Sequence, residues 1–554
     1  MFASVLSATI LGMEVCPIRV EADVSDGLPC FTMVGFASAQ VKEAQDRVRT
    51  ALRNCGISLP PKRVTVNFAP ADIRKEGAGF DMPVAAAVLA ASGMLPPQLL
   101  EDVMLVGEVS LNGEIRAVSG VLPRVIRARE LGCRYCLIPY GNLAEGVLVR
   151  DMKVIGVRSL PEMLEYIRQP ELFGRGKAAA APVPSDPSPG RAAAPVPSGL
   201  SPGNAASVPS GPLSEARVSS GQSPAGLASP SLAQEQVDFM DICGQEGARR
   251  AAEIAVSGFH NILFIGPPGA GKTMLARRIP TIMPSLTFEE SLELTKIYSI
   301  AGLLSPENPL ITNRPFRSPH HTSSPQALAG GGRVPSPGEV TLAHRGVLFL
   351  DELPEFSRTS LEVLRQPLED KKIQLSRASG TFVFPAGFIL AAAMNPCPCG
   401  CYPDMNRCRC TPGEVAHYLR KLSQPLLDRI DLCTDVPAVS FSQMESPRPG
   451  ESSASIRVRV ERTREIQAQR YAGEPICFNG ELSGKLVKKY CVLTRDAARL
   501  LGNAFETMQF SARSYHRILK VSRTVADMDK EEKIHARHVA EALAYRAFDQ
   551  KYHG

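Results

Sequence analysis

The chain has 554 residues, which at about 100–200 residues per domain predicts several domains rather than one compact module. Hydrophobic residues make up 44% of the sequence and charged residues 21%, proportions that exclude a fibrous chain and one disordered throughout. The formal net charge is +6, a balance that permits contact with nucleic acid without requiring it.

The N-terminal part, residues 1–173, alternates short apolar runs with helical patterns. Strands are expected at residues 63–68, 103–106 and 135–138, and helices at 38–55, 82–93 and 120–132. This alternation predicts an α/β or α+β domain. No basic segment precedes the first apolar residues, and no apolar run reaches about 18 residues, so we expect a cytoplasmic protein that does not enter a membrane.

Residues 174–234 are dominated by Pro, Ser, Gly and Ala and contain almost no large apolar side chains. Such a segment buries too little apolar surface to offset the conformational entropy that folding would cost. We therefore expect a disordered linker between two folded parts.

The part after the linker begins with a strand pattern at residues 262–265, which runs into a glycine-rich turn and a helical pattern. A second strand pattern ends at residue 350, so residues 235–445 are expected to form an α/β domain of the nucleotide-binding kind. The remaining residues, 446–554, are expected to form a helical domain with helices at 454–471, 494–507, 511–529 and 536–552.

The glycine-rich turn matches the phosphate-binding pattern GxxxxGK[ST] between a predicted strand and a predicted helix. Backbone N–H groups of such a loop surround phosphates, the lysine reaches the terminal phosphate oxygens, and the hydroxyl ligates Mg²⁺. The ATP-binding residues are therefore predicted to be Gly266, Pro267, Pro268, Gly269, Ala270, Gly271, Lys272 and Thr273.

Two carboxylates, Asp351 and Glu352, follow directly after the apolar run 346–350. Phosphoryl transfer requires one group to hold Mg²⁺ and another to orient the attacking water. We predict that Asp351 ligates Mg²⁺ together with Thr273 and that Glu352 polarises the water.

Longer stretches of sequence carry a family resemblance: PHHTSS, GEVTLAHRGVLFLDELPEF, MNPCPCG, LLDRID and SARSYHRILKVSRTVADM. Outside the linker, nearly the whole chain resembles the YifB/ComM family of magnesium-chelatase-like AAA+ ATPases. The resemblance implies an AAA+ P-loop domain followed by a helical lid. It also implies a homo-hexamer, because an arginine finger supplied by a neighbouring subunit requires a closed ring.

The same resemblance implies catalytic roles for three further residues. Asn395 corresponds to the sensor-1 residue, Arg429 to the trans-acting arginine finger and Arg513 to sensor 2. Simpler roles remain open: Asn395 as a strand cap, and Arg429 in an ion pair within its own chain. Which of the basic residues on the predicted helix 511–529 faces nucleotide is also open.

Residues 66–132 resemble the Lon-protease-like (ribosomal S5 domain 2-like) fold. A peptidase of that type needs a serine nucleophile and a lysine base. The aligned positions here hold Gly79 and Leu122, neither of which supplies this chemistry. Lys75 and Ser119 are near in sequence, but nothing in the sequence places them together, so we expect a scaffold or substrate-binding domain without a catalytic dyad.

Five cysteines crowd the window after Asn395. Four of them form two CxC pairs separated by eight residues, and four thiolates suit tetrahedral zinc. The predicted structural zinc ligands are Cys397, Cys399, Cys408 and Cys410, which leaves Cys401 over. Free surface thiols and an iron–sulfur cluster are the alternatives.

A strand, turn and strand pattern at 373–385 precedes the predicted sensor-1 strand. In related AAA+ helicases a hairpin at this position enters the ring pore, so Arg377, Lys371 and Lys372 are predicted to contact DNA phosphates. A solvated charged hairpin is the alternative. His320 and His321 belong to the helix-2 insert implied by the resemblance, where we expect polymer contact or loop packing rather than metal binding.

The resemblance implies a DNA helicase that promotes branch migration while transformed DNA is integrated by homologous recombination. The DNA would be branched or single-stranded and bound without sequence preference. One alternative is a chelatase-type remodeller stimulated by partner subunits. Another is a protein remodeller that holds clients with the Lon-like domain and does not respond to DNA.

Overall fold

The structure is a computed structural model that describes residues 1–169, 237–332, 335–377, 380–404, 406–438, 450–508 and 510–546. The linker predicted at 174–234 lies outside these residues, as does the end of the last predicted helix beyond residue 546. Within the described ranges, no helix combines the length and apolar character needed to cross a bilayer.

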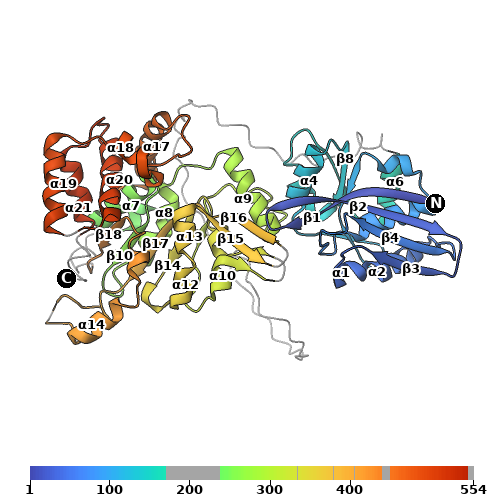
Figure 1. Cartoon of the computed structure of the whole chain (residues 1–554), viewed down its shortest axis with the longest axis horizontal. Coiled ribbons are helices and arrows are strands. Elements are labelled where there is room, and N and C mark those ends of the chain that lie inside the picture. The colour runs from blue at the N-terminus through green and yellow to red at the C-terminus, as the bar shows by residue number, and fades with distance from the viewer. Residues whose placement is uncertain are drawn as a thin grey trace, which may run out of the picture. The chain divides into compact units, whose positions relative to one another are not determined.

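The N-terminal part contains a mixed sheet of seven strands (Figure 1). In spatial order they are β3 (Cys30–Val34), β4 (Arg63–Ala69), β2 (Glu14–Ser25), β1 (Phe2–Leu11), β5 (Val103–Leu105), β8 (Tyr135–Pro139) and β9 (Lys153–Val157). Strand β2 runs antiparallel to both β1 and β4, whereas β1, β5, β8 and β9 pair in parallel.

Helices cover both faces of this sheet. On β5, Val103 and Leu105 pack in one apolar cluster with α3 (Asp81–Ala91), while Met104 packs in another with α4 (Val121–Glu130). This alternation follows from the two-residue period of a strand. The remaining elements are α1 (Ala39–Lys42), α2 (Ala44–Asn54), α5 (Leu143–Gly146), α6 (Leu160–Arg168) and the short pair β6 (Glu108–Val109) and β7 (Ile115–Arg116).

The second sheet has five strands, and every neighbouring pair is parallel. Its order is β11 (Phe316–Arg317), β14 (Val347–Leu350), β17 (Ile389–Met394), β10 (Ile262–Ile265) and β18 (Leu432–Asp435). Strands β10, β14 and β17 are apolar and buried along their whole length, as expected for a parallel sheet covered on both faces. The carboxyl ends of parallel strands share one edge, where ligands bind in open α/β sheets.

Each face of this sheet has its own apolar cluster. Ile262 and Phe264 pack with α7 (Glu246–Gly258) and α8 (Lys272–Ile282), whereas Leu263 and Ile265 pack with α14 (Pro412–Leu419). The other elements of this part are α9 (Phe288–Ile300), α10 (Pro325–Ala329), β12 (Gly330–Gly331), β13 (Ser336–Pro337), α11 (Glu339–Leu342), α12 (Arg358–Glu362), α13 (Arg365–Asp370), β15 (Lys372–Arg377), β16 (Gly380–Pro385) and α15 (Gln424–Leu427).

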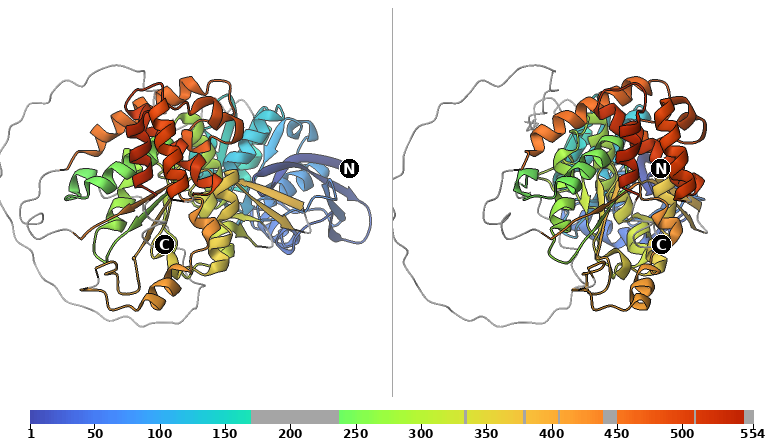
Figure 2. Two further views of the ribbon diagram at one scale, coloured as in Figure 1. Left: turned by 60° about the vertical axis from the view of Figure 1, so that its left-hand side comes forward. Right: turned by 90° about the vertical axis from the view of Figure 1, so that its left-hand side faces the viewer.

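The C-terminal part is helical, with α17 (Ser453–Arg470), α18 (Gly484–Tyr490), α19 (Arg495–Thr507), α20 (Ala512–Met528) and α21 (Ala536–Ala544). These helices, red in Figures 1 and 2, gather beside α7, and α17 and α20 both pack against it. They share one apolar cluster with α7, α8 and β10. The structure confirms a mixed α/β chain with a parallel sheet, as the sequence predicts.

Candidate functional site

The loop between β10 and α8 has a backbone that requires glycine at three positions. Gly269 and Gly271 have φ angles of 76° and 90°, in the left-handed region that side chains disfavour. A Cβ atom at Gly266 would overlap the carbonyl oxygen of Val436. Because α8 begins at Lys272, its free backbone N–H groups open onto this loop, a geometry suited to phosphate.

Lys272 joins the loop to the neighbouring strand β17. Its Nζ donates hydrogen bonds to the carbonyl oxygens of Gly266 at 2.7 Å and Pro267 at 2.8 Å, and to Oδ1 of Asn395 at 3.1 Å. Burial lowers the pKa of Lys272, and the nearby carboxylates of Asp351 and Glu352 oppose that shift. Asn395 follows the last residue of β17, so the lysine and the amide meet at the carboxyl edge of the sheet.

Thr273 links the same loop to strand β14, since its Oγ1 donates to Oδ2 of Asp351 at 2.8 Å. Glu352 follows with a φ of 51°, and its backbone N–H donates to Oδ1 of Asp351 at 3.0 Å. Glu352 and Asn395 both line a cavity of about 790 Å³. The structure thus brings together the predicted phosphate loop, both carboxylates and the predicted sensor-1 amide.

The two predicted arginines lie elsewhere in the chain. Arg429 follows α15, donates from Nη1 to the carbonyl of Pro425 at 2.7 Å and pairs through Nη2 with the carboxylate of Glu369. Arg513 is exposed in the first turn of α20, one turn before the buried Arg517. Among the described residues, neither Arg429 nor Arg513 joins the hydrogen-bond network around Lys272.

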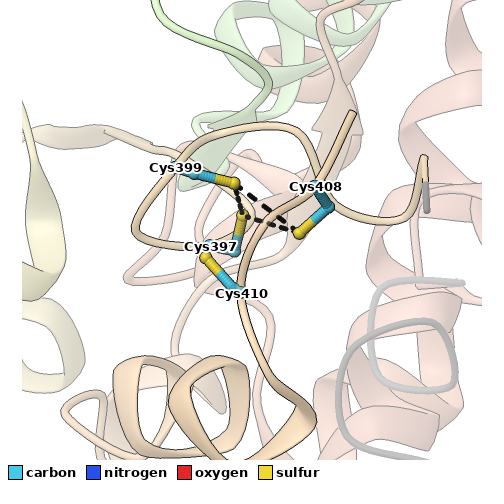
Figure 3. Close-up of side chains that lie close together, drawn as sticks. All are labelled: Cys397, Cys399, Cys408 and Cys410. Atoms are coloured by element: carbon cyan, nitrogen blue, oxygen red, sulfur yellow. Dashed lines mark hydrogen bonds between the residues drawn. The ribbon is translucent and has the colours of Figure 1, made fainter. Parts of the chain in front are cut away.

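The four predicted zinc ligands face one another from two limbs of one loop (Figure 3). All four sulfur atoms lie within 4.8 Å of one another. The Sγ of Cys397 is 3.4 Å from that of Cys399 and 3.8 Å from that of Cys408, and the Cys399–Cys408 separation is 3.6 Å. Tetrahedral zinc with bonds of about 2.3 Å would place sulfurs roughly 3.8 Å apart, so the arrangement fits zinc.

One local feature favours a thiolate at Cys399, and another ties this loop to the phosphate loop. Backbone hydrogen bonds from Arg409 and Cys401 lower the pKa of Cys399 to about 6. Gly400, with a φ of 79°, lies against Pro268, because a Cβ at position 400 would be only 2.5 Å from Cδ of that proline. Sequence patterns did not predict this contact, since it joins segments more than 130 residues apart.

Strands β15 and β16 form the predicted hairpin, in register from the Lys372–Pro385 pair to the Arg377–Gly380 pair. Arg377 and Lys372 are exposed. Lys371 instead lies at the end of α13 with Nζ 5.5 Å from the ring centroid of Phe259, and burial lowers its pKa. Its ammonium therefore packs inward rather than on the hairpin surface.

In the N-terminal part, the positions of the peptidase dyad are apolar. Leu122 is fully buried in the cluster of α4, and a Cβ at Gly79 would be 3.5 Å from a methyl group of Val106. Lys75 is also buried, and its Nζ donates to the carbonyl of Pro70. Burial lowers the pKa of Lys75.

Three models of magnesium-chelatase families match the chain. "Magnesium chelatase, subunit ChlI" matches residues 238–444, "Subunit ChlI of Mg-chelatase" matches 20–142, and "Magnesium chelatase, subunit ChlI C-terminal" matches 450–546. One model therefore matches before residues 174–234 and two match after them.

Two curated relatives are similar to the chain over almost their whole length, and a third over one part. Competence protein ComM of Haemophilus influenzae is 40% identical over 550 residues, which covers 98% of this chain and 97% of that protein. The uncharacterized protein YifB of Escherichia coli is 39% identical, covering 98% of this chain and 96% of its own. Lon protease 2 of Bacillus subtilis is 28% identical over 131 residues, or 23% of each chain.

Proposed function

The chain belongs to the YifB/ComM family of magnesium-chelatase-like AAA+ proteins, and from this premise we propose that it is an ATP-driven DNA motor. In this proposal it works as a homo-hexamer that promotes branch migration during homologous recombination. One observation carries the ATP-hydrolysis part of this proposal: Lys272, Thr273, Asp351, Glu352 and Asn395 converge at one edge of the parallel sheet. That convergence supplies the groups that phosphoryl transfer requires.

Each of these residues has a role in the proposed hydrolysis of ATP. The N–H groups of residues 266–273 hold the phosphates, and Lys272 turns from its carbonyl partners to the β and γ oxygens. Thr273 and Asp351, which share a hydrogen bond, would hold Mg²⁺, and the ion would neutralise phosphate charge. Glu352 orients the attacking water from the wall of the cavity, and Asn395 donates its amide N–H to the γ-phosphate.

The ring is needed to complete this site. In the proposal Arg429 leaves Glu369 and reaches the γ-phosphate of the neighbouring subunit, while Arg513 reads nucleotide from the helical part of its own chain. A mixture of Arg429→Ala and Glu352→Gln subunits tests the arrangement, because some interfaces then combine an intact arginine with an intact glutamate. Mixed rings should recover ATPase activity that neither variant has alone, and complete inactivity of the mixture would argue against a trans-acting Arg429.

The proposed DNA contact is the β15–β16 hairpin, where Arg377 and Lys372 present positive charge to phosphates. Lys371, whose ammonium lies over Phe259, is left out of that contact. Arg377→Glu should weaken binding to a synthetic four-way DNA junction, most strongly at low salt. Arg49→Glu, which makes the same charge change on an exposed part of α2, is the matched control. Equal binding by both variants would exclude the hairpin.

We also propose that the four-cysteine loop holds structural zinc, which stiffens the segment that lies against Pro268. Metal analysis should find about one zinc per chain, and Cys408→Ser should lose it. Cys401→Ser keeps all four proposed ligands and should retain the metal. Iron in place of zinc, or far less than one metal ion per chain, would overturn this assignment.

A protein or chelatase-type remodeller is the second candidate. The family descriptions favour it, since all three are named for a magnesium chelatase subunit, and so does the similarity to Lon protease. This candidate predicts ATPase activity stimulated by a protein partner and unaffected by DNA. The response to DNA therefore discriminates between the two functions.

A further inference from the structure

His321 lies beside the catalytic carboxylate because of the register of two strands. Strand β11 pairs in parallel with β14, with Phe316 opposite Val347 and Arg317 opposite Leu348. Residues that follow parallel neighbours emerge at the same edge of a sheet. The chain after β11 therefore arrives where the chain after β14 presents Glu352.

The contact between these two side chains is direct. Nδ1 of His321 is 3.6 Å from Oε2 of Glu352, within ion-pair range for a protonated imidazole. The ring of His321 is held between His320, whose centroid is 4.0 Å away, and Phe356, whose centroid is 6.4 Å away. Within the part of the chain that the structure describes, no other side chain forms a hydrogen bond or ion pair with the Glu352 carboxylate.

Glu352 needs such a partner to have a defined position. Its side chain is 59% exposed, and an exposed glutamate loses rotamer freedom only when something holds it. An imidazole held by its neighbours is a suitable anchor, because its own orientation is restricted. The carboxylate can then point into the cavity that it shares with Asn395.

The segment that carries His321 also reaches the proposed DNA surface. Just after the histidine, the carbonyl of Ser323 accepts a hydrogen bond of 3.0 Å from Oγ of Ser360, in the helix α12 that follows Glu352. Farther along, Gly331 lies beside Arg377, since a Cβ there would be 3.1 Å from Nη2 of the arginine. One short segment, residues 318–332, thus contacts both Glu352 and the hairpin.

We propose that His321 is a positioning residue for Glu352, and that residues 318–332 transmit DNA contact at Arg377 to the hydrolytic carboxylate. The second half rests on the proposed DNA motor function, whereas the first half needs only ATP hydrolysis. DNA that displaces the 318–332 segment would shift His321 and, through it, Glu352. The segment thereby links the polymer to the chemical step.

The first test is steady-state ATPase kinetics of the full chain without DNA. His321→Ala should lower kcat about ten- to a hundredfold, the cost of a misplaced catalytic group, and leave KM for ATP within about twofold. His321→Asn should recover much of kcat, because the amide nitrogen of asparagine lies close to the position of Nδ1. His320→Ala removes one of the two rings that flank His321 but leaves the contact with Glu352, so it should lower kcat less than His321→Ala does.

Several results would overturn the positioning role. These are an unchanged kcat in His321→Ala, equal losses in His320→Ala and His321→Ala, or no recovery in His321→Asn although it binds ATP and melts like the unmodified protein. A rise in KM that matches the fall in kcat would likewise assign His321 to nucleotide binding instead.

The second test adds a four-way DNA junction and measures the ratio of stimulated to basal rate. His321→Ala should bring that ratio close to one while junction binding stays unchanged, and an unaltered ratio would overturn the coupling. If the unmodified protein shows no response to DNA, the motor function and the coupling both fail. The comparison of kcat in the first test still decides the positioning role by itself.

Discussion

The two sheets of this protein pack their apolar side chains in the same way but differ in the polar side chains near them. Both alternate their side chains between two apolar clusters, one on each face. At the carboxyl edge of the five-stranded sheet, Lys272 reaches Asn395 and Thr273 reaches Asp351 beside an open cavity. In the N-terminal part the positions predicted to align with a peptidase dyad hold Gly79 and Leu122. The apolar pattern that makes a fold is thus separate from the few positions that carry chemistry.

In the N-terminal part, two buried charged groups are paired with groups of their own domain rather than presented to a cavity. Asp81, the first residue of α3, is fully buried and accepts from Nε of Arg47 at 2.8 Å and from the backbone of Val109 at 3.1 Å. Lys75 likewise donates a hydrogen bond to the carbonyl oxygen of Pro70. Both groups are enclosed by their own domain, whereas the carboxylate of Glu352 faces a cavity.

The largest effect is expected from Lys272→Ala, because this substitution removes the only buried cation in the phosphate loop. ATP hydrolysis should fall by about 10³-fold or more, since loss of even a single uncharged hydrogen-bond donor to a developing oxyanion costs about 10²–10³-fold. A coupled phosphate-release assay measures the loss. Lys75→Met, which removes a buried lysine from the N-terminal part, serves as the control and should leave the rate per folded molecule unchanged.

Glu352→Gln should lower the rate by about 10²-fold or more and leave ATP binding intact. The amide keeps the size of the side chain but does not activate water as a carboxylate does. Binding of a fluorescent ATP analogue, measured beside turnover, separates the two effects. Full turnover by this variant would remove Glu352 from the mechanism.

Leu122→Ala tests the structural role that we expect for this position in the N-terminal part. The fully buried leucine packs in the cluster of α4, so its truncation should destabilise the N-terminal part by about 2–5 kcal/mol. Gly79→Ser is the matched substitution at the other aligned position, where a new Cβ meets only an ordinary contact, and it should change stability little. Thermal or denaturant unfolding measures both, and a neutral Leu122→Ala would show that this position does not support the fold.

The smallest effect is expected from Gly400→Val, which tests the contact between the cysteine loop and the phosphate loop. A side chain at this left-handed position would press on Pro268 and displace the loop that holds phosphate. KM for ATP should rise about tenfold, with zinc content unchanged. Gly473→Val, at a left-handed position (φ 86°) with no neighbouring atom within 4 Å of a new Cβ, is the control, and equal KM values would show that the two loops act independently.

Sequence patterns predicted those helices and strands that are marked by a local pattern of apolar residues. The apolar run before Gly266 and the one before Asp351 became strands β10 and β14, and the helices expected at 494–507 and 511–529 became α19 and α20. Strands β1 and β2 were not predicted. On β1 the alternation breaks at residues 7–9, which are all buried, so the two-residue period is lost within the strand.

Contacts set by register could not be read from the sequence. His321 meets Glu352 only because β11 lies in parallel beside β14. Lys371 was expected at the base of the hairpin facing DNA, yet its ammonium lies over Phe259, more than 100 residues earlier in the chain. An ion pair within its own chain was the simpler role considered for Arg429, and the structure supplies a partner, Glu369, that lies 60 residues earlier. Each pairing depends on packing between distant segments.

The central proposal is that ATP hydrolysis at the five-stranded sheet drives work on DNA. The most direct measurement is the ATPase rate of the purified full chain with and without a synthetic four-way junction, at low and moderate salt, with Lys272→Ala as the blank. We predict stimulation by the junction, weaker at higher salt, with ATP-dependent conversion of the junction to two-armed products. A readily measured ATPase rate that DNA does not change at any salt concentration would contradict the DNA motor function and favour a remodeller of proteins.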